Sequence, residues 1–194
     1  MLRTLAIAVT LTLALPALAQ DAPQMTPEQE AMMQAYIAAG TPGAPHAALA
    51  SAVGEYDIAI RNWDAPGAEP TDSTGTATRK MILGGRVLVE QMQSEMYGQP
   101  FTGHGMVGFD NVTGKWWQTW NDSMSTGVML SEGECDDAGS CTFHGSWNDP
   151  VTKQATHARF TSRWADADTE VFQMYGPGPD GQEYKMMEMT YTRK

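Results

Sequence analysis

The sequence is poor in basic residues and lacks the common catalytic motifs. Of its 194 residues, 12 are Lys or Arg and 23 are Asp or Glu, which gives a formal net charge of -11. A surface of this sign repels nucleic-acid phosphates and anionic lipids. The chain contains no P-loop, no G-x-S-x-G, no H-E-x-x-H and no dinucleotide-binding glycine motif. We therefore expect no nucleic-acid partner and no cofactor.

Long apolar runs are also scarce, and the one marked run lies at the N-terminus. Residues 5–15 are mostly apolar, follow Arg3 and precede Ala17 and Ala19. This run is too short to span a bilayer, and the A-x-A pattern after it is typical of a cleavage site. The pattern predicts a signal peptide over residues 1–19 and a mature chain that begins at Gln20. The expected protein is periplasmic or secreted, with no integral membrane segment after cleavage.

Cysteine is rare, with only two residues, Cys135 and Cys141. The turn-forming residues Asp-Asp-Ala-Gly-Ser separate them, between two segments that have the pattern of strands. In an oxidising compartment this arrangement predicts a disulfide across a hairpin. A redox pair or a metal site is the alternative, but the spacing is not C-x-x-C, and two cysteines cannot complete a structural zinc site.

Residues 20–50 have a helical pattern. Thr26 and Pro27 are typical of a helix start, apolar residues follow at helical spacing, and Gly40 is a helix stop. A second short helical turn is predicted from His46 to Val53. The apolar face of the first helix, with Met32, Met33 and Tyr36, packs on its own domain or docks a partner. His46 and His104 are interpreted as surface residues.

From residue 51 to 194 the apolar period changes to two, and turn residues recur about every ten positions. No helical segment interrupts the series. The pattern therefore predicts an all-β domain, an antiparallel up-and-down barrel of about ten strands, with a sandwich as the alternative. The predicted strands are Glu55–Trp63, Thr74–Ile82, Arg86–Tyr97, Phe101–Asp110, Lys115–Asn121, Gly127–Glu134, Cys141–Trp147, Gln154–Trp164, Glu170–Tyr175 and Tyr184–Arg193.

Several of these segments resemble a secreted bacterial family known as domain of unknown function 1579. The resemblance rests on the runs RKMILGGRVLVE at 79–90, GQPF at 98–101, GFDN at 108–111, DSMSTG at 122–127, and YGPGPDG at 175–181 followed by MME at 186–188. The similar segments follow one another in the same order as in the family, and the resemblance covers residues from Val53 to Lys194. It implies a calycin-like barrel, the architecture of lipocalins and fatty-acid-binding proteins. No activity is established for the family, so the resemblance assigns no functional residue.

Hairpin registers divide the predicted strands into an inner and an outer face. With Gly98-Gln99 as a two-residue turn and Asp110 opposite Lys115, the apolar residues fall on one face. That face holds Leu88, Met92, Met96, Phe101, Val107, Phe109, Trp116 and Trp120. Two polar residues share it, because this register places Glu90 opposite Val107 and Val107 opposite Gln118.

An inward-facing carboxylate is costly unless it is paired, is neutralised, or anchors a ligand. Glu90 and Gln118 either anchor the polar end of a ligand, or Glu90 pairs with Arg86 or an arginine of a neighbouring strand in a satisfied core. The methionines fit a deformable apolar lining better than a Cu(I) site. The predicted ligand-binding residues are Glu90, Met92, Trp116, Gln118 and Trp120, with Met187, Met189 and Tyr191 from the last strand.

A second set of polar residues has the composition of a metal site. With Cys135 opposite Cys141 and a turn at Pro150-Val151, Glu132, His144 and His157 fall in one row across three strands. Two histidines and one carboxylate are a known ligand set for iron. The same face carries other polar residues, so an exposed ladder of polar pairs on the outer wall is the favoured interpretation.

Together these observations favour an exported barrel that binds a small apolar or amphipathic molecule in its interior. Two alternatives remain at this point. One is an enzyme, an isomerase or hydrolase that uses Glu90 as acid or base, or a metal-dependent enzyme at His144 and His157. The other is a packed barrel that acts through protein contacts. The sequence gives no indication of the oligomeric state.

Overall fold

The computed structural model describes residues 25–194, so the predicted signal peptide lies outside the described residues. The described chain forms two helices followed by ten strands. They are α1 (Pro27–Gly40), α2 (Ala44–Ser51), β1 (Gly54–Asn62), β2 (Thr71–Ile82), β3 (Val87–Met96), β4 (Gln99–Asp110), β5 (Lys115–Asp122), β6 (Met129–Cys135), β7 (Cys141–Asn148), β8 (Ala155–Trp164), β9 (Thr169–Pro177) and β10 (Glu183–Arg193).

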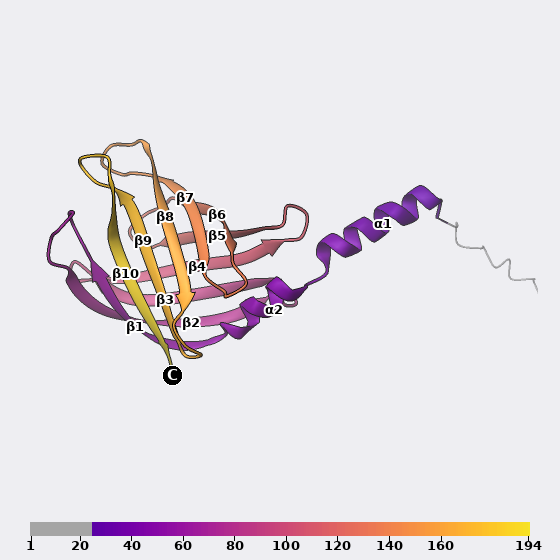
Figure 1. Cartoon of the computed structure of the whole chain (residues 1–194), viewed down its shortest axis with the longest axis horizontal. Coiled ribbons are helices and arrows are strands. Elements are labelled where there is room, and N and C mark those ends of the chain that lie inside the picture. The colour runs from indigo at the N-terminus through magenta and orange to yellow at the C-terminus, as the bar shows by residue number, and fades with distance from the viewer. Residues whose placement is uncertain (1–24) are drawn as a thin grey trace, which may run out of the picture. The chain divides into compact units, whose positions relative to one another are not determined.

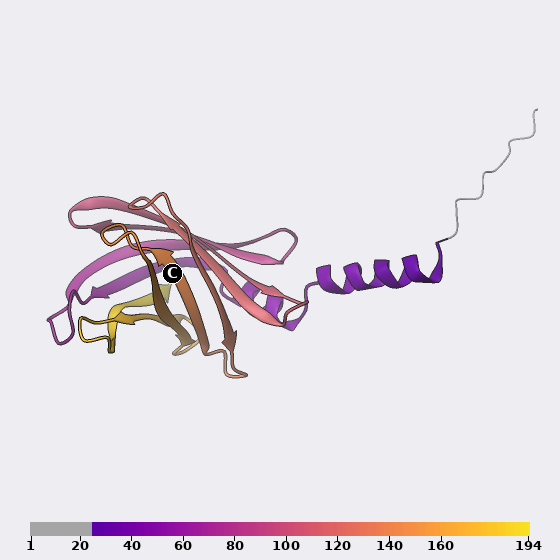
Figure 2. The same ribbon diagram turned by 90° about the horizontal axis from the view of Figure 1, so that it is seen from above.

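The strands close into an antiparallel up-and-down barrel. Each strand pairs with its neighbours in the sequence, and β1 also pairs with β10, which completes the ring. The predicted fold class is therefore confirmed, including the helix that precedes the barrel. Figures 1 and 2 show the ring of strands from two directions, with α2 lying at one end of it.

The alternation of apolar and polar residues places the core inside the ring. In β1, Tyr56, Ile58 and Ile60 are buried, and the residues between them are exposed. The buried side chains Ala77, Met92, Phe101, Met189 and Tyr191 join them in the main apolar cluster. Two further clusters complete the interior, one under α2 and one around Phe143 and Phe160.

The predicted pairing of β4 with β5 is confirmed, with Asp110 opposite Lys115, but the predicted pairing of β3 with β4 is wrong by two residues. The turn consists of Tyr97 and Gly98, whose φ angles are 52° and 72°. Met96 therefore pairs with Gln99, and Glu90 lies opposite Gly105 rather than Val107. Two positive φ values are what a two-residue hairpin turn requires. Because the error is an even number of residues, each side chain keeps its predicted face.

Helix α1 begins with the predicted cap. The amide of Thr26 donates to the side chain of Gln29 at 2.8 Å, and the amide of Gln29 donates to the Thr26 hydroxyl at 3.2 Å. This reciprocal pair satisfies two amides that the first helical turn leaves free. No residue of α1 is buried. The role of its apolar side chains stays a prediction.

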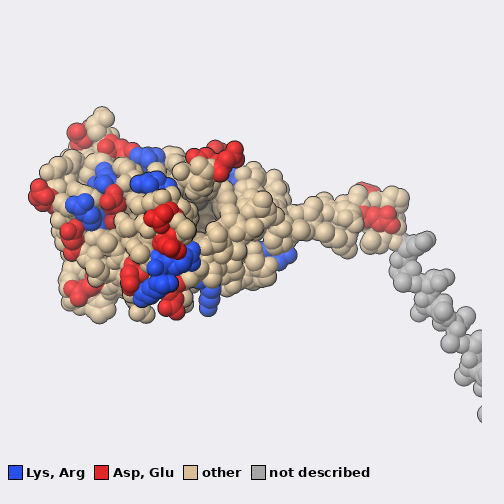
Figure 3. All heavy atoms as spheres, turned by 60° about the horizontal axis from the view of Figure 1, so that its bottom comes forward, with Lys and Arg blue, Asp and Glu red and all other residues tan. Residues whose placement is uncertain are grey.

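The predicted disulfide is present, since Cys135 of β6 and Cys141 of β7 are bonded across the hairpin. Within the described part of the chain, neither helix has the length and apolar character needed to cross a membrane. On the face of the barrel in Figure 3, acidic and basic side chains lie close to one another. On this face, the acidic residues are thus interspersed with basic ones.

Candidate functional site

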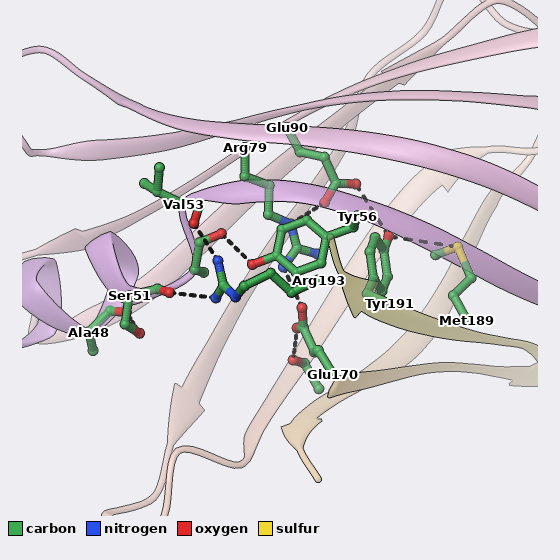
Figure 4. Close-up of polar contacts among 12 residues, drawn as sticks. Ala48, Ser51, Val53, Tyr56, Arg79, Glu90, Glu170, Met189, Tyr191 and Arg193 are labelled. Atoms are coloured by element: carbon green, nitrogen blue, oxygen red, sulfur yellow. Dashed lines mark hydrogen bonds and ion pairs between the residues drawn. The ribbon is translucent and has the colours of Figure 1, made fainter. Parts of the chain in front are cut away.

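A cluster of charged residues lies inside the barrel. Arg79 of β2 is 8% exposed and lies between Glu90 of β3 and Glu170 of β9. Its Nε donates to Glu90 Oε2 at 2.6 Å, and its Nη1 donates to Glu170 Oε2. Figure 4 shows the two carboxylates on either side of the guanidinium, Glu90 from the neighbouring strand β3 and Glu170 from β9. Burying a charge is costly unless it is paired, so this arrangement is what permits three charges in the interior.

Two tyrosines enclose the guanidinium. The Arg79 Cζ lies 4.8 Å from the ring centre of Tyr56 and 4.4 Å from that of Tyr191. The hydroxyl of Tyr191 donates to Glu90 Oε1 at 3.3 Å. Each carboxylate thus has partners on both oxygens, because the Ser162 hydroxyl donates to the remaining oxygen of Glu170. We call this group the Arg79 cluster: Tyr56, Arg79, Glu90, Ser162, Glu170 and Tyr191.

Burial and charge act together on the ionisation of the cluster. Burial alone would lower the pKa of Arg79, but the carboxylates of Glu90 and Glu170 hold it well above its ordinary value. For Tyr191, burial raises the pKa well above 10.0, and the negative charge of Glu90 raises it further. Both residues therefore keep one protonation state at neutral pH, the arginine charged and the tyrosine neutral.

The raised pKa of Tyr191 predicts a loss of stability in alkaline solution. The protonated phenol contributes stability that is fully present below pH 10, the ordinary pKa. This contribution is lost as the pH rises through the higher folded-state pKa, at up to about 1.4 kcal/mol per pH unit. We expect Tyr191→Phe to flatten the fall of the unfolding free energy above pH 10, measured by urea denaturation. Tyr97→Phe, at a position 86% exposed, is the control. Equal slopes for wild type and Tyr191→Phe would contradict this assignment.

The cluster is connected to the backbone that follows α2. The hydroxyl of Tyr56 donates to the carbonyl of Ala52 at 2.8 Å. Arg193 of β10 donates to the carbonyls of Val53 and Ser51 at 2.5 and 2.9 Å, and its guanidinium lies 5.1 Å from the Tyr56 ring centre. Figure 4 shows this continuous path from the end of α2 to the buried carboxylates. The C-terminal carbonyls of a short helix thus receive hydrogen bonds from the barrel wall.

The predicted ligand-binding residues all lie on strands whose inner face bounds the interior, but they are not in one place. Glu90 and Tyr191 belong to the Arg79 cluster, and Met92 and Met189 are buried next to it. Trp120 and Met187 are half-buried against the main apolar cluster. Trp116 instead packs under α2, and half-buried Gln118 pairs in register with Ser131. Glu90 pairs with Arg79, an arginine of a neighbouring strand, as one of the two alternatives above proposed. Arg86, the other candidate partner, donates instead to the carbonyls of Gly40 and Leu83.

The predicted metal row does not form. Glu132 does lie opposite His144, but His144 lies opposite Arg159, and His157 lies opposite Ser146. The turn before β8 is longer than predicted, because Asp149 accepts hydrogen bonds from the amides of Val151 and Thr152. Among residues 25–194 no three His, Cys, Asp or Glu side chains are arranged to hold a metal ion.

The outer wall over β5, β6 and β7 carries a hollow of about 840 Å³. Glu132 and His144 line it, together with Lys115, Trp117 and Leu130 from the same strands. Lys115 and Glu132 are 3.6 Å apart there, and both side chains are largely exposed. Glu132 and His144 are thus exposed and paired in register on this wall.

Sequence reasoning missed four residues of the Arg79 cluster, which are Tyr56, Arg79, Ser162 and Glu170, and it also missed the burial of His46. Arg79 and Glu170 are separated by 91 positions and meet only because the barrel closes. Tyr56 was placed on a strand without a role. His46 was predicted at the surface, but it is 5% exposed, and its Nδ1 accepts a hydrogen bond from the amide of Gly43 at 3.0 Å. Alternation along β2 is the signal that could have found Arg79, because this residue lies two positions from Ala77 and so shares its inner face.

The fold and the site define a closed antiparallel β-barrel with an internal ion cluster next to a helix at one end. The chain belongs to the DUF1579 family, described as a protein of unknown function, whose family model matches residues 41–193. No curated protein matches the chain.

The chain is similar to solved structures at low sequence identity. The crystal structure of Rv2717c from M. tuberculosis is similar with a TM-score of 0.61 and 14% identity, over 79% of this chain and 99% of that one. A redesigned β-barrel is also 14% identical over 79% of this chain and 99% of that one, with a TM-score of 0.39. The likeness to Rv2717c supports the barrel architecture alone.

Proposed function

We propose that this protein is exported and holds a small apolar or amphipathic molecule inside its barrel. The observation that carries the proposal is the incomplete burial of apolar side chains on the inner face. Trp120, Phe172 and Met187 face the interior next to the main cluster, yet each keeps part of its surface accessible. Accessible apolar surface inside a closed barrel is what a ligand would cover.

The composition of this inner surface supports a ligand of variable shape. Met92, Met96, Met187 and Met189 all pack in or against the main apolar cluster. Methionine is unbranched and polarizable, so it adapts to irregular apolar shapes. The disulfide supports an oxidising compartment, as export would require. The acid–base alternative has less support, because Glu90 is engaged by Arg79 and Tyr191.

The test is a titration with N-phenyl-1-naphthylamine, a neutral apolar dye whose fluorescence rises out of water. We expect wild type to bind it saturably. Met187→Glu places a charge on the inner face of β10 and should weaken binding about tenfold or more, because burying an unpaired carboxylate is unfavourable. Thr190→Glu places the same charge on the outer face of the same strand and should leave binding unchanged.

The two β10 variants must first be shown to unfold at similar temperatures, so that affinity alone is compared. Failure of the wild-type protein to bind any apolar dye saturably would overturn the proposed function. Equal weakening by both variants would place the dye on the outer wall instead.

A further inference from the structure

The two ends of the barrel differ. Because successive strands are antiparallel, the connections β1–β2, β3–β4, β5–β6, β7–β8 and β9–β10 all lie at one end. We call this the distal end; its loops comprise residues 63–70, 97–98, 123–128, 149–154 and 178–182. The other end is the α2 end, where α2 packs against β2, β3 and β4. Figure 1 shows α2 at this end, beside the C-terminus of β10.

The α2 end is closed by apolar packing and hydrogen bonds. Leu49 and Ala52 are buried with Leu88, and Trp116 and Trp164 pack around them. The segment before α2 is held by Asn111, whose amide donates to the Thr41 carbonyl at 2.8 Å. The segment after α2 is held by Tyr56 and Arg193, as described above. The helix is thus attached to the barrel on both sides.

The Arg79 cluster forms the next layer. On β2, Arg79 lies between Met81, which packs under α2, and Ala77 of the main cluster. On β3, Glu90 lies in the same way between Leu88 and Met92. All three charges are paired, so a molecule crossing this layer would have to separate buried ions.

The distal side of this layer is mainly apolar. From the cluster toward the distal end, the inner face of β3 presents Met92, Ser94 and Met96, and β10 presents Met189 and then Met187. The Ser94 hydroxyl is satisfied by the wall itself, since it donates to the Thr74 carbonyl at 2.9 Å. Met189 lies at the boundary, since the Tyr191 hydroxyl is 3.8 Å from its sulfur. Met96 pairs with Gln99 beside the distal turn, and Met187 pairs with Asn62 at the distal end of β1.

We propose that the ligand is a single-chain amphiphile that enters at the distal end and lies with its apolar tail toward the Arg79 cluster and its polar group at the distal rim. This orientation rests on the proposed function and specifies it further. A ligand carboxylate directed inward would meet a guanidinium that two carboxylates already share. An inward tail meets methionine and aromatic surface instead.

Nitroxide-labelled stearic acids test the orientation in the wild-type protein. The methionine methyl groups are labelled with carbon-13, and their signals are assigned by single Met→Leu substitutions. A nitroxide at carbon 16, near the tail end, should broaden Met92 and Met189 more than Met96 and Met187. A nitroxide at carbon 5, near the carboxylate, should give the reverse order. Stearate is a stringent test of the orientation, because its carboxylate would bind Arg79 if that residue had no carboxylate partners.

Each outcome decides one point. The reverse pattern, or equal broadening by the two probes, overturns the inward tail while leaving interior binding intact. Broadening of none of the four methionines overturns the proposed function as well, because no chain then enters the barrel.

A head-group series gives an independent check. Dodecanoate, dodecanol and dodecyltrimethylammonium should displace the naphthylamine dye with affinities within about threefold of one another, because a head group at the rim is screened by water and salt. A preference for dodecanoate of about tenfold or more would indicate a carboxylate bound to Arg79 and would overturn the orientation.

Discussion

Replacement of Arg79 by methionine is expected to lower the free energy of unfolding by about 3–5 kcal/mol, because it leaves two buried carboxylates without their counter-ion. Glu90 and Glu170 have side chains only 13% and 11% exposed, so water cannot replace the guanidinium. The variant also loses the contacts between Arg79 and the rings of Tyr56 and Tyr191. Urea denaturation at neutral pH measures the loss.

Two further variants separate the charge effect from the loss of packing. A triple variant that combines Arg79→Met with Glu90→Met and Glu170→Leu removes all three charges, and we expect it to regain most of the lost stability. Arg61→Met breaks an ion pair with Asp72 whose side chains are 49% and 73% exposed, and it should cost less than about 1 kcal/mol. A triple variant as unstable as Arg79→Met alone would show that unpaired charge is not the cause.

The strands were predictable because their period is set by local sequence. All ten were found within a few residues of their ends, since inward apolar residues alternate with outward polar ones. Registers were predictable where the turn carried its own signal, or where the disulfide fixed the pairing, as it does between β6 and β7. Between β4 and β5, Asp110 accepts a hydrogen bond from the amide of Val112, and Gly114 adopts a φ of 68°. Between β3 and β4, Tyr97 adopts a positive φ, which its residue type does not indicate.

The charged interior was predictable only in part. An inward Glu90 follows from alternation, and so does the need for a partner. The identity of the partners depends on which strands meet, and Glu170 reaches Arg79 only because β1 pairs with β10. Local pattern carries no information on ring closure, so the second carboxylate could not be assigned. The same limit applies to His46, whose burial depends on α2 lying on the barrel end.

Closure also depends on positions where two strands approach closely, and Gly133 of β6 is the clearest of them. A Cβ at this position would lie 2.2 Å from the carbonyl oxygen of Thr142 and 2.8 Å from the Cα of Phe143. Both are backbone atoms of β7, which cannot move aside as a flexible side chain could. Gly133 also lies opposite Trp116 on β5, and Trp116 packs under α2. Gly133 itself lines the outer hollow.

We therefore expect Gly133→Ala to lower the free energy of unfolding by about 1–3 kcal/mol, since one added methyl group forces β6 and β7 apart. Part of the loss should come from Phe143, which is 5% exposed and belongs to the third apolar cluster. Gly40→Ala is the matched control, because a Cβ there meets no atom within 4 Å. That control should leave stability unchanged or slightly raised, as alanine favours a helix. Equal urea midpoints for Gly133→Ala and wild type would contradict this prediction. They would mean that β6 and β7 can move apart without loss of stability, so that their close approach does not contribute to barrel closure.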